Sequence, residues 1–207
     1  MNYKPQVSKK HYLGSYVARD RWLNYFIQIS WVMGLKPETV LEIGVGNRIV
    51  CDTLGKLGIK VTALDIAGDL KPDIVASVTK MPLADKSFDV VLAAEILEHI
   101  PWEELPGALS EIRRVSKKYA VITFPHSGYT FSFSWKVPLL PPQRWIFKIP
   151  HFWKKHVFNG EHYWELGKRG FPVRRVKKLL QSSGFKVIKS GTDPEDPAHW
   201  AFLLESV

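Results

Sequence analysis

Two glycines at alternate positions follow a short apolar run at residues 39–43, within the sequence VLEIGVGNR. A helix is expected directly after them. Glycines there let a ligand approach the backbone closely, and the free N–H groups of a helix start favour a carboxylate or phosphate. Asp65 ends the next apolar run, 23 residues after Glu42, where a carboxylate usually binds ribose hydroxyls. The combination favours an adenosine-containing ligand over a tight turn without one.

The residues around the glycines distinguish between adenosine cofactors. A dinucleotide site typically reads GxGxxG, but Ile49 occupies the position of the third glycine. Glu42 precedes the glycines and is poorly suited to a neighbouring pyrophosphate, whereas it suits a cationic ligand. S-adenosylmethionine carries a sulfonium and an ammonium group, so the charge pattern favours it. The missing glycine disfavours a nicotinamide oxidoreductase.

The strands and helices that would position this turn alternate along the chain. Apolar residues at helical spacing predict a helix over 20–34, within an N-terminal helical segment, residues 1–36. Strands are predicted at 39–43, 60–64, 73–76, 88–93 and 119–124, with helices at 48–57 and 101–116 between them. This alternation indicates βαβ units and a parallel sheet. A basic helix at 172–183 and an antiparallel strand pair at 185–190 and 200–204 complete the chain.

The strings EIGVG, LDI and MPLADKSFDVVLAAEILEHIP resemble the class I S-adenosylmethionine-dependent methyltransferases, in particular the type 11-like methyltransferase domain. The resemblance covers residues 39–124, and GFKVI and WAFLLE resemble the family's last two strands. It implies an α/β fold with a doubly wound, mostly parallel seven-stranded sheet, ordered 3-2-1-4-5-7-6 with strand 7 antiparallel. Helices would cover both faces. The expected organisation is a single domain, residues 1–207, with an aromatic and basic insertion or lid at 125–170 after strand 5.

The resemblance also implies a set of cofactor-binding residues. Glu42, Gly44 and Gly46 would shape the methionine side of the pocket, with Asn47 next to them. Asp65 would bind the ribose and Ile66 would pack beside the adenine, whose edge Ser77 and Val78 would contact. Ala94 and Glu95 would meet the methionine end through their backbone. Arg48 replaces a third glycine of the family, and Ser77 replaces an acid, so both bear on how tightly the cofactor binds.

Methyl transfer needs alignment more than a dedicated acid, although an oxygen or nitrogen nucleophile can need a base. The candidate catalytic residues are His99, in LEHI near the pocket, His126, which follows the fifth strand, and His162, in GEHYW of the insertion. His151 and His156 are interpreted as solvated members of a basic loop. They lack accompanying carboxylates in a metal-binding pattern, so no metal is predicted.

The net charge of +9 is concentrated in one region. Residues 126–178 hold eleven basic and two acidic side chains, and the rest of the chain is neutral. Eleven aromatic residues are interleaved with lysines between residues 126 and 164. Such a segment suits a folded lid, a lid on a lipid-like substrate, peripheral contact with an anionic membrane, or less readily a nucleic acid.

Composition favours a cytoplasmic protein. The only cysteine is Cys51, the N-terminus lacks a signal-peptide core, and no uncharged apolar run is long enough to span a bilayer. The sequence therefore predicts S-adenosylmethionine-dependent methyl transfer to a small or lipid-like acceptor. The alternatives are a methyltransferase-like protein that binds the cofactor without catalysis, and an RNA-directed methyltransferase. The oligomeric state stays open.

Overall fold

The computed structural model describes residue 6 and residues 18–207, so residues 1–5 and 7–17 of the predicted N-terminal segment lie outside the described part. The helices are α2 (Arg19–Gly34), α3 (Ile49–Lys56), α4 (Leu105–Val115) and α5 (Val173–Ser182), with short 3-10 turns at Gly68–Leu70, Leu97–His99 and Trp102–Glu104. The strands are β1 (Thr39–Ile43), β2 (Lys60–Asp65), β3 (Ile74–Val75), β4 (Phe88–Ala94), β5 (Ser116–Pro125), β6 (Gly128–Trp135), β7 (Gln143–Pro150), β8 (Phe185–Asp193) and β9 (Asp196–Ser206).

Seven strands form one sheet in the order β3-β2-β1-β4-β5-β9-β8. The first five pair in parallel, whereas β9 lies antiparallel to both β5 and β8. Because β8 and β9 are the sixth and seventh strands of this sheet along the chain, the predicted order 3-2-1-4-5-7-6 with strand 7 antiparallel is confirmed.

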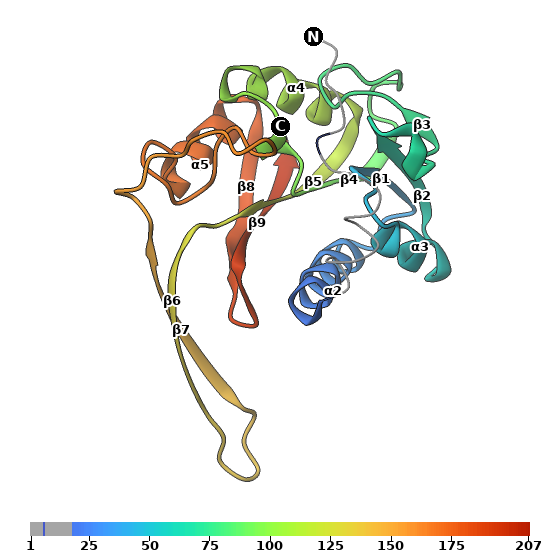
Figure 1. Cartoon of the computed structure of the whole chain (residues 1–207). Helices are drawn as coiled ribbons and strands as arrows, with labels where there is room; N and C mark the ends of the chain where they lie inside the picture. Colours follow the sequence, from blue (N-terminus) through green and yellow to red (C-terminus); the bar gives the residue numbers. More distant parts are fainter. Residues whose placement is uncertain (1–5, 7–17) are drawn as a thin grey trace.

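Helices cover both faces of the sheet, with α2 and α3 on one side and α4 and α5 on the other (Figure 1). Residues of β1 alternate between the two layers: Val40 belongs to the apolar cluster that includes residues of α2 and α3, and Leu41 to the cluster that includes residues of α4 and α5. Glu42 is the next residue on the α2 side, so the period of two turns this carboxylate toward α2.

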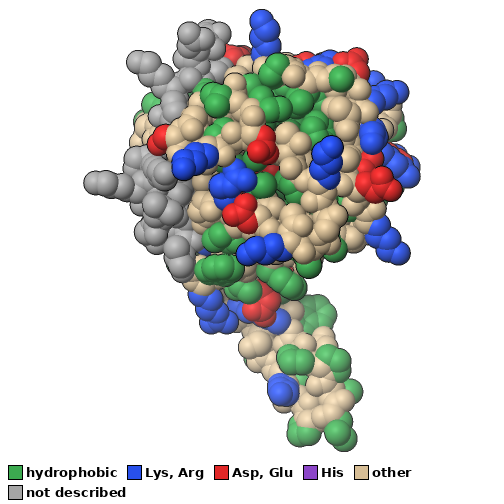
Figure 2. Space-filling view, turned by 90° about the vertical axis from the view of Figure 1, so that its right-hand side faces the viewer, with side chains coloured by type: hydrophobic (Ala, Val, Ile, Leu, Met, Phe, Trp, Pro, Cys, Tyr) green, Lys and Arg blue, Asp and Glu red, His purple; other side chains and the backbone are tan. Residues whose placement is uncertain are grey.

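The predicted elements are present with shifted ends. The helix expected over 101–116 begins with a 3-10 turn at Trp102–Glu104, and the α-helix starts at Leu105, because Pro106 suits a first helical turn. The segment 125–170 contains a two-stranded hairpin, β6–β7, which the sequence interpretation did not anticipate. This hairpin extends away from the sheet and carries hydrophobic side chains to its tip (Figures 1 and 2).

Candidate functional site

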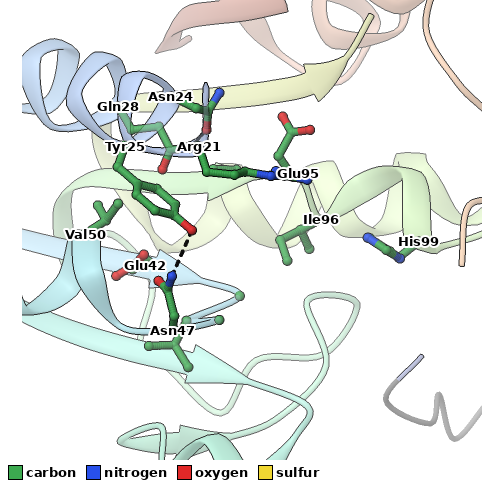
Figure 3. Close-up of a pocket in the computed structure, with 14 residues that line it drawn as sticks. Arg21, Asn24, Tyr25, Gln28, Glu42, Asn47, Val50, Glu95, Ile96 and His99 are labelled. Carbon is green, nitrogen blue, oxygen red and sulfur yellow. Dashed lines mark hydrogen bonds between the residues drawn. The ribbon is translucent and has the colours of Figure 1, made fainter. Parts of the chain in front are cut away.

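A pocket lies between α2 and the carboxyl ends of β1 and β4 (Figure 3). Its lining comes from three segments: Arg21, Asn24, Tyr25 and Gln28 of α2; Glu42, Gly44, Val45, Gly46, Asn47 and Val50 of the glycine turn; and Ala94, Glu95, Ile96 and His99 after β4. Ligands of open α/β sheets bind at this edge, next to the point where the strand order reverses. The pocket therefore lies where the fold places a cofactor.

The backbone of the glycine turn takes positive φ angles, which residues with a side chain adopt only at a cost in free energy. Gly44 and Gly46 have φ values of 82° and 49°. A Cβ atom on Gly44 would overlap the side chain of Ile96, so this glycine also lets the loop after β4 approach the turn. Arg48, at the position of the family's third glycine, takes a left-handed conformation with φ 66°. Its side chain donates to the carbonyl of Lys71 and contacts Asp52, so it does not line the pocket.

Glu42 is buried at the floor of the pocket, with 5% of its surface exposed. Its Oε2 atom has no hydrogen-bond partner among the described residues. Burial raises the pKa of this carboxyl to about 8, and the nearby Arg48 guanidinium only partly opposes the shift. A buried carboxyl without a partner is costly unless a cation or a proton accompanies it. The pocket floor thus favours a cationic ligand.

Asp65 holds the glycine turn in place from the end of β2. Its Oδ2 accepts the backbone N–H of Val45 at 2.9 Å, and its Oδ1 accepts that of Ala67 at 2.8 Å. Asp65 is buried and lies beside the pocket rather than in its lining. Ile66 follows it and is half-buried. The sequence interpretation favoured a ribose contact for Asp65, and the structure shows that its carboxylate fixes the loop.

Two predicted adenine contacts lie outside the pocket lining. Ser77 Oγ is 2.8 Å from Thr79 Oγ1, within a tight turn. The Val78 side chain is buried in the core with Met81. Only their backbone and the Ser77 hydroxyl remain to meet a ligand.

The α2 side of the pocket was missed by the sequence interpretation. Asn24 and Gln28 are buried polar residues one helical turn apart, and Gln28 Nε2 donates to Asn24 Oδ1. Tyr25 Oη accepts from Asn47 Nδ2 at 2.9 Å, which links α2 to the glycine turn. A signal was present, because polar residues at i and i+4 interrupt the apolar face of this helix.

Glu95, directly after β4, lies in a strained position that the surrounding strands hold. It has φ 56°, which non-glycine residues seldom adopt. Thr123 Oγ1 donates to Glu95 Oε1 at 2.8 Å, and His199 Nε2 lies 3.5 Å from Glu95 Oε2. His199 Nδ1 in turn lies 2.7 Å from Asp196 Oδ1. These contacts, which involve β5 and β9, fix the side chain of Glu95 at the pocket.

Two of the three candidate catalytic histidines, His99 and His162, lie together, and His126 lies elsewhere. His99 lines the pocket, and its ring meets that of His162 edge to face, with centroids 4.8 Å apart. Burial and the neighbouring His162 lower the pKa of His99 to about 4. His126 is buried against Trp200 under the base of the hairpin and does not line the pocket. His156, expected in a solvated loop, is buried instead, and its Nε2 lies 2.8 Å from the carbonyl of His162.

Residues 41–124 match the model of a family described as a methyltransferase domain. This segment contains the glycine turn, Asp65 and the loop after β4, and its fold is the one that the sequence predicts. Residues 41–124 are therefore similar to methyltransferase domains, in agreement with the resemblance seen in the sequence.

Curated relatives are named ubiquinone biosynthesis O-methyltransferases. The one from Paramagnetospirillum magneticum is 26% identical over 155 residues, which are 67% of this chain and 61% of the relative. The one from Paracidovorax citrulli is 34% identical over 94 residues, 36% of this chain and 40% of the relative. The chain thus spans at most about three fifths of the length of these relatives.

Solved structures share the fold at low sequence identity. A 1,6-didemethyltoxoflavin-N1-methyltransferase from Burkholderia thailandensis, with bound S-adenosylhomocysteine, has a TM-score of 0.63 at 14% identity. That match covers 99% of this chain and 93% of the other. The magnesium protoporphyrin IX methyltransferase of Synechocystis, also with S-adenosylhomocysteine, has a TM-score of 0.63 at 13% identity and covers 99% and 90%.

Proposed function

We propose that the protein binds S-adenosylmethionine in this pocket and transfers its methyl group to an oxygen of a small or lipid-like acceptor. Glu42 is the observation that carries the proposal. It is a buried carboxyl with an unpartnered oxygen, it faces a pocket at the carboxyl edge of the sheet, and it suits the cationic end of that cofactor. The oxygen acceptor is supported by the names of the curated relatives.

Other residues take roles that follow from their positions. The backbone of the Gly44–Gly46 turn lies against the ligand, and Asp65 retains lone pairs for the ribose hydroxyls while it holds the turn. Ile66, Ser77 and Val78 lie toward the adenine side. Glu95 and His99 border the opposite end of the pocket, where the acceptor would enter. S-adenosylmethionine supplies an activated methyl group on sulfur, and the chain supplies alignment.

A turnover assay with methyl-labelled S-adenosylmethionine tests this proposal. The acceptors are hydroxylated aromatic compounds with and without an isoprenoid tail, and total RNA. We expect S-adenosylhomocysteine and an O-methylated aromatic product. Cofactor binding without any turnover would favour the non-catalytic alternative, and label found only in RNA would favour the RNA-directed one.

We further propose that the β6–β7 hairpin contacts an anionic membrane, where a lipid-like acceptor would reside. The hairpin has two unlike faces. The cross-strand pairs on one face are Tyr129–Ile149, Phe131–Phe147 and Phe133–Trp145, and those on the other are Thr130–Lys148, Ser132–Ile146 and Ser134–Arg144. Phe133 is 67% exposed and Trp145 is 68% exposed. A ribbon with one aromatic face suits the boundary between headgroups and acyl chains.

Charge and tip composition support the same partner. Residues 127–160 contain basic side chains but no aspartate or glutamate. The exposed tip residues Leu139 and Leu140 are flanked by prolines at 138, 141 and 142, which lack the N–H group that would need a partner in lipid. Among the described residues, no helix has the length and apolarity needed to cross a bilayer. The aromatic face and the apolar tip of the hairpin would make the contact.

Co-sedimentation with phosphatidylglycerol vesicles tests the membrane proposal. We expect the double variant Phe131→Ser/Phe133→Ser to bind at least about tenfold more weakly, because each ring buries about 150–250 Å². The matched control, Thr130→Ala/Ser132→Ala, changes the opposite face and should bind like the unaltered protein. Lys148 is not a suitable target, since its Nζ donates to the carbonyls of His126 and Pro197. A protein that stays in the supernatant with anionic and neutral vesicles would contradict the proposal.

A further inference from the structure

Glu98 is a second buried carboxyl that no described group satisfies. It lies in the 3-10 turn after β4, is 1% exposed, and neither of its carboxyl oxygens has a hydrogen-bond partner among the described residues. Burial, and then the charge of Glu95, raise its pKa well above the ordinary value. Either a proton or a cation must accompany this carboxyl.

Two imidazole rings stand next to it. Glu98, His99 and His162 each offer one ligand atom, and these atoms lie within 4.8 Å of one another. The segment that carries His162 is fixed onto the turn, because the backbone N–H of Tyr163 donates to the carbonyl of Glu98 at 2.9 Å. Asn159 Oδ1 accepts the backbone N–H of His162 at 2.8 Å and shapes the loop that presents the ring.

The hydrogen bonds of His99 prepare it as a metal ligand. Its Nδ1 lies 3.1 Å from the carbonyl oxygen of Glu161 and 2.9 Å from Gln6 Oε1, and both of these atoms are acceptors. Nδ1 therefore carries the proton, and the lone pair is on Nε2. Metal-binding histidines usually donate their other ring N–H to a carbonyl or carboxylate in this way.

We propose that Glu98, His99 and His162 bind a divalent transition-metal ion of the zinc class. Two imidazoles and a carboxylate are a typical set of three protein ligands for such an ion, with a further coordination position left open. Tetrahedral bonds of about 2.0–2.1 Å place ligand atoms about 3.4 Å apart, so atoms now up to 4.8 Å apart would need to approach by up to about 1.4 Å.

The position of the cluster suggests its use. His99 lines the cofactor pocket, so an ion here would lie at the end of the pocket where the acceptor enters. An open coordination position would bind the acceptor hydroxyl and favour loss of its proton to solvent. The oxygen would then form its bond to the methyl carbon as the carbon–sulfur bond breaks and leaves a neutral thioether. This use rests on the proposed function, whereas metal binding does not.

Cobalt(II) is the probe for the site, because its visible absorption reports the number and type of ligands. Full-length protein is first treated with a chelator and dialysed, and Co²⁺ is then titrated alone, with Zn²⁺ added to displace it. We expect one equivalent to bind with the absorption of a low-coordinate site. Glu98→Gln and His162→Ala should each weaken binding more than about 100-fold, since even outer-shell partners cost about 10–100-fold.

The matched control is His151→Ala, which removes a histidine outside the cluster and should leave Co²⁺ binding unchanged. His162→Ala removes a partly exposed ring at the surface, so it remains informative if Glu98→Gln fails to fold. No binding of Co²⁺ by the unaltered protein, or equal binding by the cluster variants, would overturn the proposal. Titration with S-adenosylmethionine in parallel separates the two ideas. Cofactor binding without Co²⁺ binding refutes the metal site alone, and Co²⁺ binding without cofactor binding refutes the proposed function alone.

Discussion

The central sheet and the β6–β7 hairpin are both rich in large apolar residues, yet they place them differently. Phe124 of β5 is 1% exposed and packs against Trp164 and Phe202. Phe133 of β6 is 67% exposed, since β6 and β7 pair only with each other and no helix of the described part of the chain covers their aromatic face. The same residue type therefore stabilises the fold in one region and remains available for a partner in the other.

The largest expected effect tests this contrast directly. Phe124→Ala should lower the free energy of unfolding by about 3–5 kcal/mol, because it leaves a cavity in the core. Phe133→Ala should change it by no more than about 0.5 kcal/mol, as is usual for exposed positions. Urea denaturation of the two variants measures both values. A comparable loss in Phe133→Ala would show that the hairpin packs on the protein, and the comparison would fail.

The second prediction concerns pH and the base of the hairpin. Burial, and then the charge of Lys148, lower the pKa of His126 from 6.5 to about 4. The unfolded chain therefore binds this proton below about pH 6.5, whereas the folded protein binds it only near pH 4. The contribution of this residue, about 3 kcal/mol, should be lost as the pH falls through that range.

His126→Phe checks this assignment, because it keeps a ring against Trp200 but removes the titrating group. Denaturation at pH 7 and pH 4.5 should show a smaller loss of stability on acidification in the variant than in the unaltered protein. His99 titrates in the same range, so some loss should remain. An identical pH dependence in the two proteins would refute the role of His126.

A smaller effect on binding and stability is expected at Asp65, which ends β2 of the central sheet beside the pocket. Asp65→Ala removes the proposed charged partner of the ribose, which should weaken binding of S-adenosylmethionine about 10–100-fold, since such bonds contribute about 1.5–3 kcal/mol. It also leaves the N–H groups of Val45 and Ala67 without their acceptor, so the variant should be less stable. Calorimetry and thermal unfolding measure the two effects. The control Glu38→Ala removes an exposed carboxylate and should affect neither.

Local patterns made much of this molecule predictable. The segment 39–43 is a short apolar run followed by glycines, so β1 and the turn were predicted at the observed positions. The β6 strand carried an equally regular signal, with aromatic residues alternating with Ser and Thr, but its proline-rich surroundings were interpreted as an irregular insertion. Alternation of aromatic and polar residues predicts a strand. It does not show whether another layer of the protein covers the aromatic face.

Contacts between distant segments were not predictable in the same way. The expectation of no metal considered His151 and His156, which are close in sequence. Glu98 and His162 come from separate segments that meet only after the chain folds. The α2 residues of the pocket were interpreted as a core-facing helix, because helical periodicity shows a face but not what the face contacts. Burial of Asn24 and Gln28 shows that polar interruptions of such a face can mark a pocket.

Calorimetric titration with S-adenosylmethionine at pH 7 tests the central claim, that the Glu42 pocket binds this cofactor. Since burial raises the pKa of Glu42 to about 8, a cationic ligand should ionise it and release up to about one proton. The measured heat should then differ between phosphate and Tris buffers. Glu42→Gln should bind at least about tenfold more weakly with no buffer dependence, while the exposed control Glu38→Gln behaves like the unaltered protein. Binding of NADH in place of S-adenosylmethionine, or equal affinity and proton release in Glu42→Gln, would contradict the account.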